Sequence, residues 1–389
     1  MKLKLSFLFF LFILFSTYAQ EIRLSNNTTV SVLTVGPGAS LNDAFGHNAF
    51  RIKDEKLGLD LVYGYGQYDF DAPNFYLKFA QGKLKYLISR NNYTNFYGFY
   101  VHHNRTIKQQ ILNLSISEKQ KLFDYLENNY KPENRKYLYD FFYDNCATRI
   151  KDVTQVATAN KINFDLPNDY ETKTFRELIH EHVGLNTWGS FGIDIALGSI
   201  IDREATPEEQ MFLPKYIHAF FGEAKLSDSK KLVKSESVLF QNETEKFDSN
   251  VVLSPIVIMG ILGLIIGFIT YRDSKNNTRS KWLDIVIFTI TGLIGVLVLL
   301  LWFATDHTAT AYNYNLLWAM PLNLLVIGQL FRKDIKNWFK GYLKFLILMF
   351  CLMTLHWVVG VQVFAIGLIP LLIALAFRYI YLLKYYKSH

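Results

Sequence analysis

The sequence contains two cysteines, and one of them stands in a setting suited to nucleophilic chemistry. Cys146 lies in the run Tyr143–Thr148 (YDNCAT), where a helical pattern begins, while Cys351 lies in a long apolar segment. Unpaired N–H groups and the positive dipole end at a helix N-terminus stabilise a thiolate, and they can also hold an oxyanion. A lone cysteine can instead be a small buried apolar residue. The position at a helix start favours the nucleophile.

A thiol nucleophile needs a base, and His47 is the histidine whose position suits that role best. It follows Phe45-Gly46 at a point where a loop enters a strand, so a base there would be held at the mouth of a sheet. Sequence does not reveal the distance between His47 and Cys146, so chemistry alone pairs them only weakly. The other histidines of the same region give weaker signals: His102, His103, His180, His182 and His218.

The segments that must position these residues predict a mixed, α+β domain. Apolar and polar residues alternate in the manner of strands over residues 30–35, 49–52 and 59–65. Ser117 and Gln120 resemble a capping box that opens a helix running to about Asn129. A second helix is expected from Asn145. Residues 227–252, rich in Lys, Ser and Glu, read as a linker, so the domain is expected over residues 20–226.

The first 19 residues have the three parts of a secretory signal. Lys2 and Lys4 give a short basic region, Leu5–Phe15 an apolar run, and Thr17–Ala19 a small-residue cleavage site. Cleavage after Ala19 would leave residue 20 at the mature N-terminus. An uncleaved anchor is the alternative interpretation. Either way, the signal predicts that the following domain is exported.

The C-terminal part, residues 253–389, predicts a bundle of about five transmembrane helices. Five apolar segments approach the length of about 20 residues that a bilayer requires: 253–271, 283–304, 316–331, 343–359 and 363–383. Lys and Arg gather in alternate loops and at the C-terminus, and basic loops stay in the cytoplasm. The pattern therefore places the α+β domain outside a bacterial inner membrane and the C-terminus in the cytoplasm. Arg378 is expected to extend towards the cytoplasmic face.

The charge balance and the motifs that are absent exclude several function classes. The formal net charge is +7, but much of the surplus Lys and Arg flanks the apolar segments, so we expect no nucleic-acid partner. The sequence has no zinc-type Cys and His spacing, no phosphate-binding loop and no dinucleotide fingerprint. We therefore expect neither a metal nor a cofactor.

Several runs of the sequence together match the pattern of one family: FGH (45–47), YDFFYDNCATR (139–149), FGIDIALG (191–198), DR (202–203), FLP (212–214), TDH (305–307) and NYNLLW (313–318). These runs resemble the Bacteroidota lipoprotein N-acyltransferases (Lnb), over nearly the whole mature chain. The order, with the histidine first and Asn-Cys later at a helix start, is also similar to circularly permuted papain-like (NlpC/P60-like) enzymes. The resemblance implies that fold for the exported domain.

The resemblance also implies a reaction that the bare chemistry permits. Cys146, activated by His47, would attack an acyl ester of a phospholipid, and the thioester would acylate the α-amine of a diacylated lipoprotein. Asn145 and the Cys146 amide are candidates for the oxyanion site. A third group should orient His47, and the sequence leaves Asp54, Tyr63 and Asp69 as alternatives.

Polar residues at the expected outer ends of the membrane segments form a second candidate site. Asp306 and His307 follow the second segment, and Asn313 and Asn315 precede the third. Polar residues near the bilayer are often functional because burying them in lipid is costly. They could line the region where a lipid substrate meets the exported domain, or form an ordinary wetted loop.

Two other classes of function remain open at this point. A membrane-anchored peptidase or amidase acting on peptidoglycan peptides could use the same Cys146 and His47. A noncatalytic lipid-binding module would need Cys146 only for packing. Five membrane segments favour an enzyme with lipid-bearing substrates over an enzyme acting on a water-soluble polymer.

Overall fold

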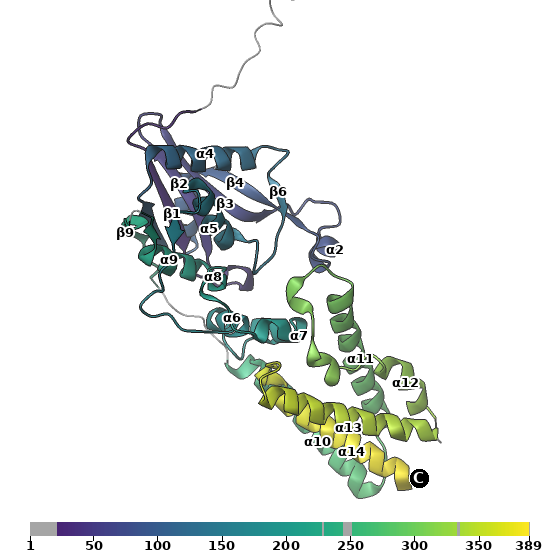
Figure 1. The fold of residues 1–389 in the computed structure, drawn as a ribbon. Coiled ribbons are helices and arrows are strands. Elements are labelled where there is room, and N and C mark those ends of the chain that lie inside the picture. The colour runs from purple at the N-terminus through teal and green to yellow at the C-terminus, as the bar shows by residue number, and fades with distance from the viewer. Residues whose placement is uncertain (1–21, 228, 244–250, 333–334, 389) are drawn as a thin grey trace, which may run out of the picture.

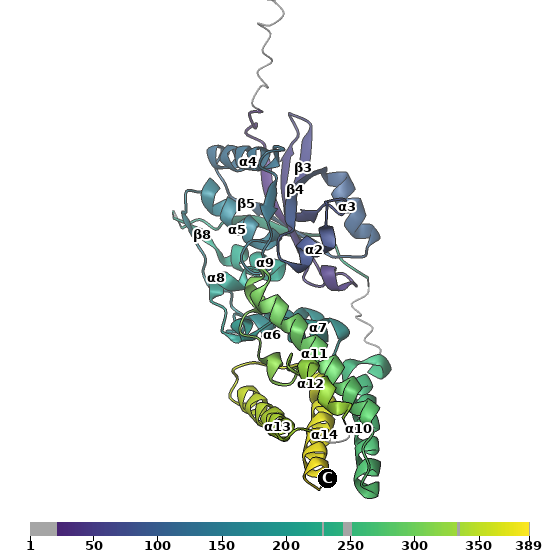
Figure 2. The same cartoon turned by 90° about the vertical axis from the view of Figure 1, so that its right-hand side faces the viewer.

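The computed structural model describes residues 22–388 except 228, 244–250 and 333–334. The predicted signal, residues 1–19, lies outside the described residues. An α/β domain forms one end of the molecule and a group of long helices forms the other (Figures 1 and 2). The two parts meet through the segments around α2, α6 and α7.

A seven-stranded sheet, antiparallel in every pairing, forms the centre of the α/β domain. The strand order is β6-β4-β3-β2-β1-β5-β9, and β7 and β8 pair separately. The predicted strands correspond to the first three, so the prediction of a mixed α and β domain is confirmed. The strand bounds are β1 Thr29–Val35, β2 His47–Asp54, β3 Leu59–Tyr68, β4 Lys85–Asn92, β5 Ile107–Leu112, β6 Lys136–Leu138, β7 Ile162–Asn163, β8 Lys225–Leu226 and β9 Val233–Phe240.

Strand β9 differs from the sequence prediction, which treated residues 227–252 as a linker. Residues Val233–Phe240 pair with β5 at the edge of the sheet. Most side chains of this strand are exposed, because an edge strand has one neighbour only. A strand in that position is as polar as a linker, so composition did not separate the two.

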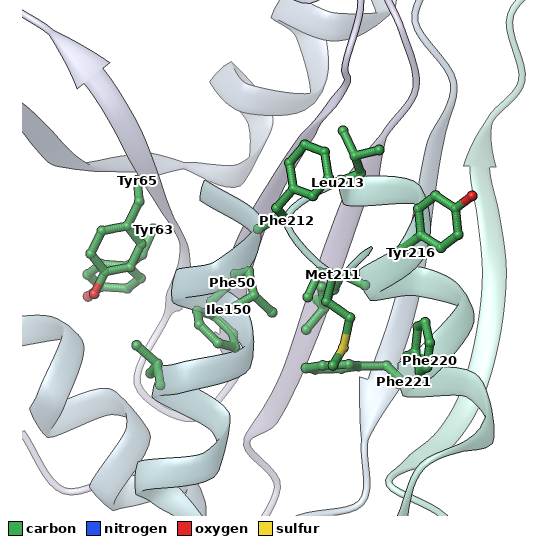
Figure 3. Close-up of a cluster of buried hydrophobic side chains, with 14 of the residues drawn as sticks. Phe50, Tyr63, Tyr65, Ile150, Met211, Phe212, Leu213, Tyr216, Phe220 and Phe221 are labelled. Carbon is green, nitrogen blue, oxygen red and sulfur yellow. The ribbon is translucent and has the colours of Figure 1, made fainter. Parts of the chain in front are cut away.

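Helices cover both faces of the sheet. α4 (Ile116–Tyr130), α5 (Cys146–Ala157) and α9 (Pro214–Glu223) pack with the main core on one face, and α3 (Tyr93–His102) lies on the other. In Figure 3, Ile150 of α5 lies beside Phe50 of β2, so α5 is fixed against the strands that carry the site. The capping box of α4 is Ser115 with Glu118, and not the predicted Ser117 with Gln120.

The remaining elements of the domain are short. They are η1 Leu41–Asp43, α2 Phe75–Ala80, α6 Phe175–Val183, α7 Trp188–Ala196, η2 Ser199–Asp202 and α8 Pro207–Gln210. α6 and α7 lie between the sheet and the membrane helices (Figure 1).

Four helices among the described residues are long and apolar enough to cross a membrane. They are α10 Pro255–Asn276, α11 Lys281–Phe303, α13 Asn337–Val358 and α14 Ile369–Ser388. The predicted span at 316–331 is not one helix. It contains the end of a 3₁₀ turn, Tyr314–Leu317, and the eight-residue α12, Asn323–Leu330. This broken segment packs closely against α11, since a methyl group on Gly295 would lie 2.1 Å from the Ala319 carbonyl oxygen. Interrupted backbone is tolerated at membrane depth where protein covers it.

Arg378 does not extend to the surface as expected. Its guanidinium is fully buried and donates to Asp284 Oδ1 at 2.7 Å and to Asp273 Oδ2 at 2.8 Å. The two carboxylates come from α11 and α10, so the ion cluster joins three helices. Opposite charges in contact remove the need for the arginine to reach water.

The α/β domain is fixed to the helices by polar contacts around α7. The Asn313 amide donates to the carbonyls of Ile195 and Ala196 at 2.8 and 3.0 Å, and Asn315 Nδ2 donates to Asp194 O at 2.8 Å. Both asparagines are fully buried. These bonds satisfy carbonyls in the last turn of α7, which have no helical partner of their own.

The junction predicts a stability effect at Gly198. A methyl group there would lie 1.8 Å from the carbonyl oxygen of Ala311, so Gly198→Ala must push the two parts apart. We expect a loss of about 1–3 kcal/mol, measured as a lower thermal unfolding midpoint in detergent. Gly192→Ala is the matched control in α7, because the added methyl would meet no described atom within 4 Å beyond its own helix backbone and chain neighbours. Equal midpoints for the two variants would contradict the described junction.

Candidate active site

Cys146 is the first residue of α5, and the Asn145 side chain caps the helix. Asn145 Oδ1 accepts from the N–H groups of Ala147 at 2.7 Å and Thr148 at 3.0 Å. Its Nδ2 donates to Phe141 O at 2.6 Å and to Phe212 O at 2.8 Å. All of these bonds hold the backbone around the cysteine. In this structure the Asn145 amide therefore fixes where the helix begins and is not directed at a substrate.

The Cys146 side chain is partly exposed, and backbone N–H groups surround its sulfur. The backbone N–H groups of Asn48, Cys146 and Ala147 act on the thiol and lower its pKa, against the larger opposing effect of burial. The regular pairing of β2 with β3 stops at Ala49 and Gly64, so the N–H of Asn48 lies one residue beyond that register. The thiol thus lies at the point where the pairing of β3 with β2 ends.

A bulge in β3 makes room for the cysteine. The register of β3 against β4 shifts between Gly64 and Gln67, and Gly66 within the bulge has φ +93°. That backbone conformation favours glycine. A methyl group on Gly66 would lie 3.9 Å from the Cβ of Cys146, so the bulge passes directly beside the nucleophile.

His47 begins β2, immediately before the residue whose N–H reaches the thiol. The fold therefore brings the two residues singled out from the sequence to the same point of the sheet. The His47 ring stacks on Tyr100 of α3, with centroids 6.3 Å apart and planes at 27°. A methyl group on Gly64 would lie 3.0 Å from Nε2 of His47, so the glycine leaves space for the ring.

A buried arginine, Arg105, sits behind this pair. Its Nε donates to Gly36 O at 2.9 Å, its Nη1 donates to Asp43 Oδ1 at 3.3 Å, and its guanidinium lies 4.9 Å from the centre of the Tyr100 ring. Only 5% of the residue is exposed. Arg105 therefore anchors the loop that leads into His47 and places a positive charge near the site.

Burial keeps both reacting groups neutral, and Arg105 adds to this effect at His47 only. Burial, and then the charge of Arg105, lower the pKa of His47 to about 4 against an opposing effect of Asp43. Burial raises the pKa of the Cys146 thiol, although the surrounding N–H groups and Arg105 oppose that rise. At neutral pH the resting site holds a thiol and a neutral imidazole, which is a base ready to accept a proton.

The three residues proposed from the sequence to orient His47 lie elsewhere. The Tyr63 hydroxyl donates to Glu127 of α4 at 2.5 Å. Asp54 ends β2, at the opposite end from His47, and accepts from Ser25 and Thr28. Asp69 is exposed in the loop after β3.

The groups that do act on the His47 ring were not singled out from the sequence. They are Asp43, Tyr100 and Arg105. Asp43 stands four residues before His47, and this proximity was a usable signal. Tyr100 and Arg105 come from a separate helix and the loop after it, and no spacing pattern links them to His47.

The membrane-side candidates divide into two groups. Asn313 and Asn315 are buried, and their amides are bonded to the backbone of α7. Asp306 and His307 lie in the loop after α11, against the segment that follows α2: the N–H of Asp306 donates to Gln81 O at 2.8 Å. In the same loop, Thr308 Oγ1 donates to Asp140 Oδ2 at 2.7 Å, six residues before Cys146. This loop therefore connects the end of a membrane helix with the segment that leads to the nucleophile.

An antiparallel α/β domain with a capped cysteine and a neighbouring histidine, joined to several membrane-crossing helices, defines a multi-pass membrane protein with an extramembrane site. Two family models match the chain: the Lnb N-terminal periplasmic domain over residues 15–181 and the Lnb transmembrane domain over residues 246–389. The chain belongs to the Lnb family. No curated protein and no solved structure matches it. Membership implies an acyltransferase that is associated with the membrane and acts on lipoproteins.

Proposed function

We propose that this protein is a lipoprotein N-acyltransferase that works through a thioester on Cys146. The acyl donor is a membrane phospholipid, and the acceptor is the α-amine of the N-terminal cysteine of a diacylated lipoprotein. The observation that carries the proposal is that Cys146 begins a capped helix and that His47 begins β2 next to Asn48, whose N–H acts on the thiol. The arrangement of a cysteine at the start of α5, which packs on the sheet that carries the histidine, also supports a permuted papain-like fold.

In the first half-reaction His47 takes the proton of Cys146 as the sulfur attacks the ester carbonyl. The carbonyl oxygen becomes an oxyanion, and we assign the N–H groups of Asn48 and Cys146, which act on the neighbouring sulfur, as its donors. The bond between the acyl carbon and the glycerol oxygen then breaks, and the imidazolium protonates that oxygen of the departing lysophospholipid. We expect the hydrogen bond between His47 and the thiol to form when substrate is bound, because catalytic hydrogen bonds often reach their working geometry only in the complex.

In the second half-reaction the α-amine attacks the thioester carbonyl. A C–N bond forms, the C–S bond breaks, and His47 passes the amine proton to the departing sulfur. The product is an amide and the free thiol of Cys146 is restored. No oxidant, reductant or metal enters the balance.

We further propose that the α/β domain faces the periplasm at the bacterial inner membrane, with the C-terminus in the cytoplasm. The basic loops support this orientation. Arg279 Nη2 donates to Leu330 O at 2.5 Å, and Lys281 Nζ donates to Phe331 O at 3.2 Å. These basic residues thus gather at the end of the helices away from the α/β domain (Figure 1), where the positive-inside rule expects the cytoplasm.

The direct test is to trap the acyl group. Purified full-length protein is mixed with vesicles that contain a phospholipid with an isotope-labelled acyl chain, and the Cys146 peptide is analysed by mass spectrometry. We expect a labelled acyl adduct that hydroxylamine removes. Addition of a synthetic diacylated lipopeptide should transfer the label to its α-amine. An unmodified Cys146 together with an unmodified lipopeptide would overturn the proposal.

The lowered pKa of His47 predicts an unusual pH profile for formation of the thioester. The imidazole must be neutral to act as base, so the rate should stay level from pH 8 down past 6.5 and fall only near the folded pKa of about 4. Arg105→Met removes a charge that disfavours the imidazolium, so the acid limb should move to higher pH. Asp43→Asn removes a charge that favours it, so the limb should move lower still. Rapid-quench measurements across pH check both directions, and shifts of the same sign would contradict the assignment.

A further inference from the structure

The helix α2 and its flanks expose an unusual number of large apolar side chains. We call residues 70–83 the α2 segment. Helix α2 itself has no buried residue, and Tyr76 is 81% exposed. Phe70, Leu77 and Phe79 are also more than half exposed. Soluble surfaces rarely carry a contiguous apolar patch of this kind unless it contacts another body.

The structure indicates what that body is, because the α2 segment is attached to the end of a membrane helix. α11 ends at Phe303, and the loop after it bonds to the segment: Asp306 N donates to Gln81 O at 2.8 Å, and His307 Nε2 lies 3.2 Å from Ala80 O. A methyl group on Gly82 would lie 3.0 Å from the backbone nitrogen of His307. At 1.5 Å per residue, the 23 residues of α11 are slightly longer than a bilayer core of about 30 Å. The α2 segment therefore lies at the level of the lipid headgroups, as its place beside the end of α11 in Figure 1 indicates.

Basic side chains accompany the apolar ones. Lys78 belongs to α2, and Lys83 is 53% exposed at 3.9 Å from Asp306. Apolar and aromatic residues mixed with lysine are the composition of segments that lie in the membrane interface. A phospholipid leaflet fits this surface better than a folded partner, since the attachment to α11 leaves the segment beside lipid.

Aromatic rings continue from the α2 segment to the nucleophile. The Tyr68 ring lies 5.8 Å from that of Phe75 and 5.4 Å from that of Tyr86, and Tyr86 stacks on Tyr139 at 4.2 Å. Gly66 completes the series, because a methyl group there would lie 3.5 Å from the Tyr139 ring and 3.9 Å from the Cβ of Cys146. The rings thus form a continuous series of aromatic contacts from the α2 segment to the side of Cys146.

We infer that the α2 segment inserts its exposed side chains into the outer lipid leaflet and guides an acyl chain along the Tyr68–Tyr86–Tyr139 rings to Cys146. Insertion stands on the attachment to α11, whereas the guiding of an acyl chain rests on the proposed function. Lipid that has entered beside α2 would reach the thiol without leaving an apolar surface.

Two measurements test the two parts separately. In the first, full-length protein in vesicles is irradiated with a phospholipid that carries a diazirine on its acyl chain, and crosslinked peptides are mapped by mass spectrometry. Crosslinks on residues 70–83 are expected, whether or not Cys146 becomes acylated. Their absence, with crosslinks present on the membrane helices, would overturn insertion.

In the second measurement, Leu77→Ser/Phe79→Ser is compared with Leu57→Ser/Val156→Ser, which removes two exposed apolar side chains outside the α2 segment. We expect the α2 variant to lose roughly tenfold or more of the rate of Cys146 acylation by vesicle phospholipid. Its reaction with a small soluble activated ester should equal that of the control variant. Equal rates with phospholipid would overturn the acyl route. Failure of wild-type acylation would refute the proposed function, while the crosslinks would still decide insertion.

Discussion

Replacing Cys146 with serine is expected to abolish acyl transfer and to leave the folded protein intact. A serine hydroxyl is a far weaker nucleophile at neutral pH than a cysteine sulfur, and this site is built around sulfur and a neutral imidazole. Loss of a nucleophile that works as a unit with its base lowers turnover by on the order of 10⁴-fold or more. The side chain is partly exposed and differs from serine by one atom, so the thermal unfolding midpoint should barely move. Mass spectrometry of a diacylated lipopeptide incubated with each protein in vesicles gives the readout.

The second cysteine supplies a matched control for this experiment. Cys351 is exposed on α13, and Cys351→Ser should retain full transfer activity. The pair also separates the classes of function that the sequence left open. A lipid-binding module would keep its function in Cys146→Ser, whereas a peptidase would lose cleavage of peptidoglycan peptides and never acylate the lipopeptide. Undiminished transfer by Cys146→Ser would refute the thioester.

The positions of Cys146 at a helix start and His47 at a strand start could be predicted because their signals are local. A helix start depends on a few residues, and the helix expected from Asn145 does begin there, with Asn145 as its cap. The signal for His47 at the beginning of a strand is equally local, since Gly46 and the alternating run after it lie within one short segment. The prediction that Cys146 and His47 act together came from the family pattern, because the spacing of two residues along a chain does not fix the distance between them.

The surroundings of the pair could not be predicted, because they depend on tertiary contacts. Tyr63 looked suitable on a strand beside His47, but its side chain points to α4, where Glu127 accepts a hydrogen bond from its hydroxyl. Alternation along a strand sends neighbouring residues to opposite faces. Arg105 reaches the site from a loop after α3, and nothing in its own neighbourhood in the sequence marks it.

The membrane part shows the same division between local and tertiary signals. Four spans follow from length and hydropathy alone. The segment from Tyr314 to Leu330 is apolar enough for a span, yet the backbone is interrupted between Leu317 and Asn323, and inside the protein the Tyr342 hydroxyl donates to Asn323 Oδ1 at 2.6 Å. Arg378 could be paired only once α10 and α11 were known to be its neighbours. Hydropathy identifies the helices that face lipid, but it does not identify the segments and charged residues that the rest of the protein covers.

Replacing His47 with glutamine is expected to slow formation of the thioester by roughly 10²–10⁴-fold, the usual contribution of a positioned base. Without the imidazole the thiol must ionise alone, and burial raises its pKa above the ordinary value. The residual rate of His47→Gln should therefore climb with pH up to at least pH 9, while the wild-type rate stays level. Rapid-quench measurement of Cys146 acylation at several pH values separates the two profiles, and His102→Gln, an exposed histidine on α3, is the control. A His47→Gln profile that stays as level as that of the wild type would mean that another group removes the proton, and Asp43 and Tyr100, which lie around the ring, would be the next to test.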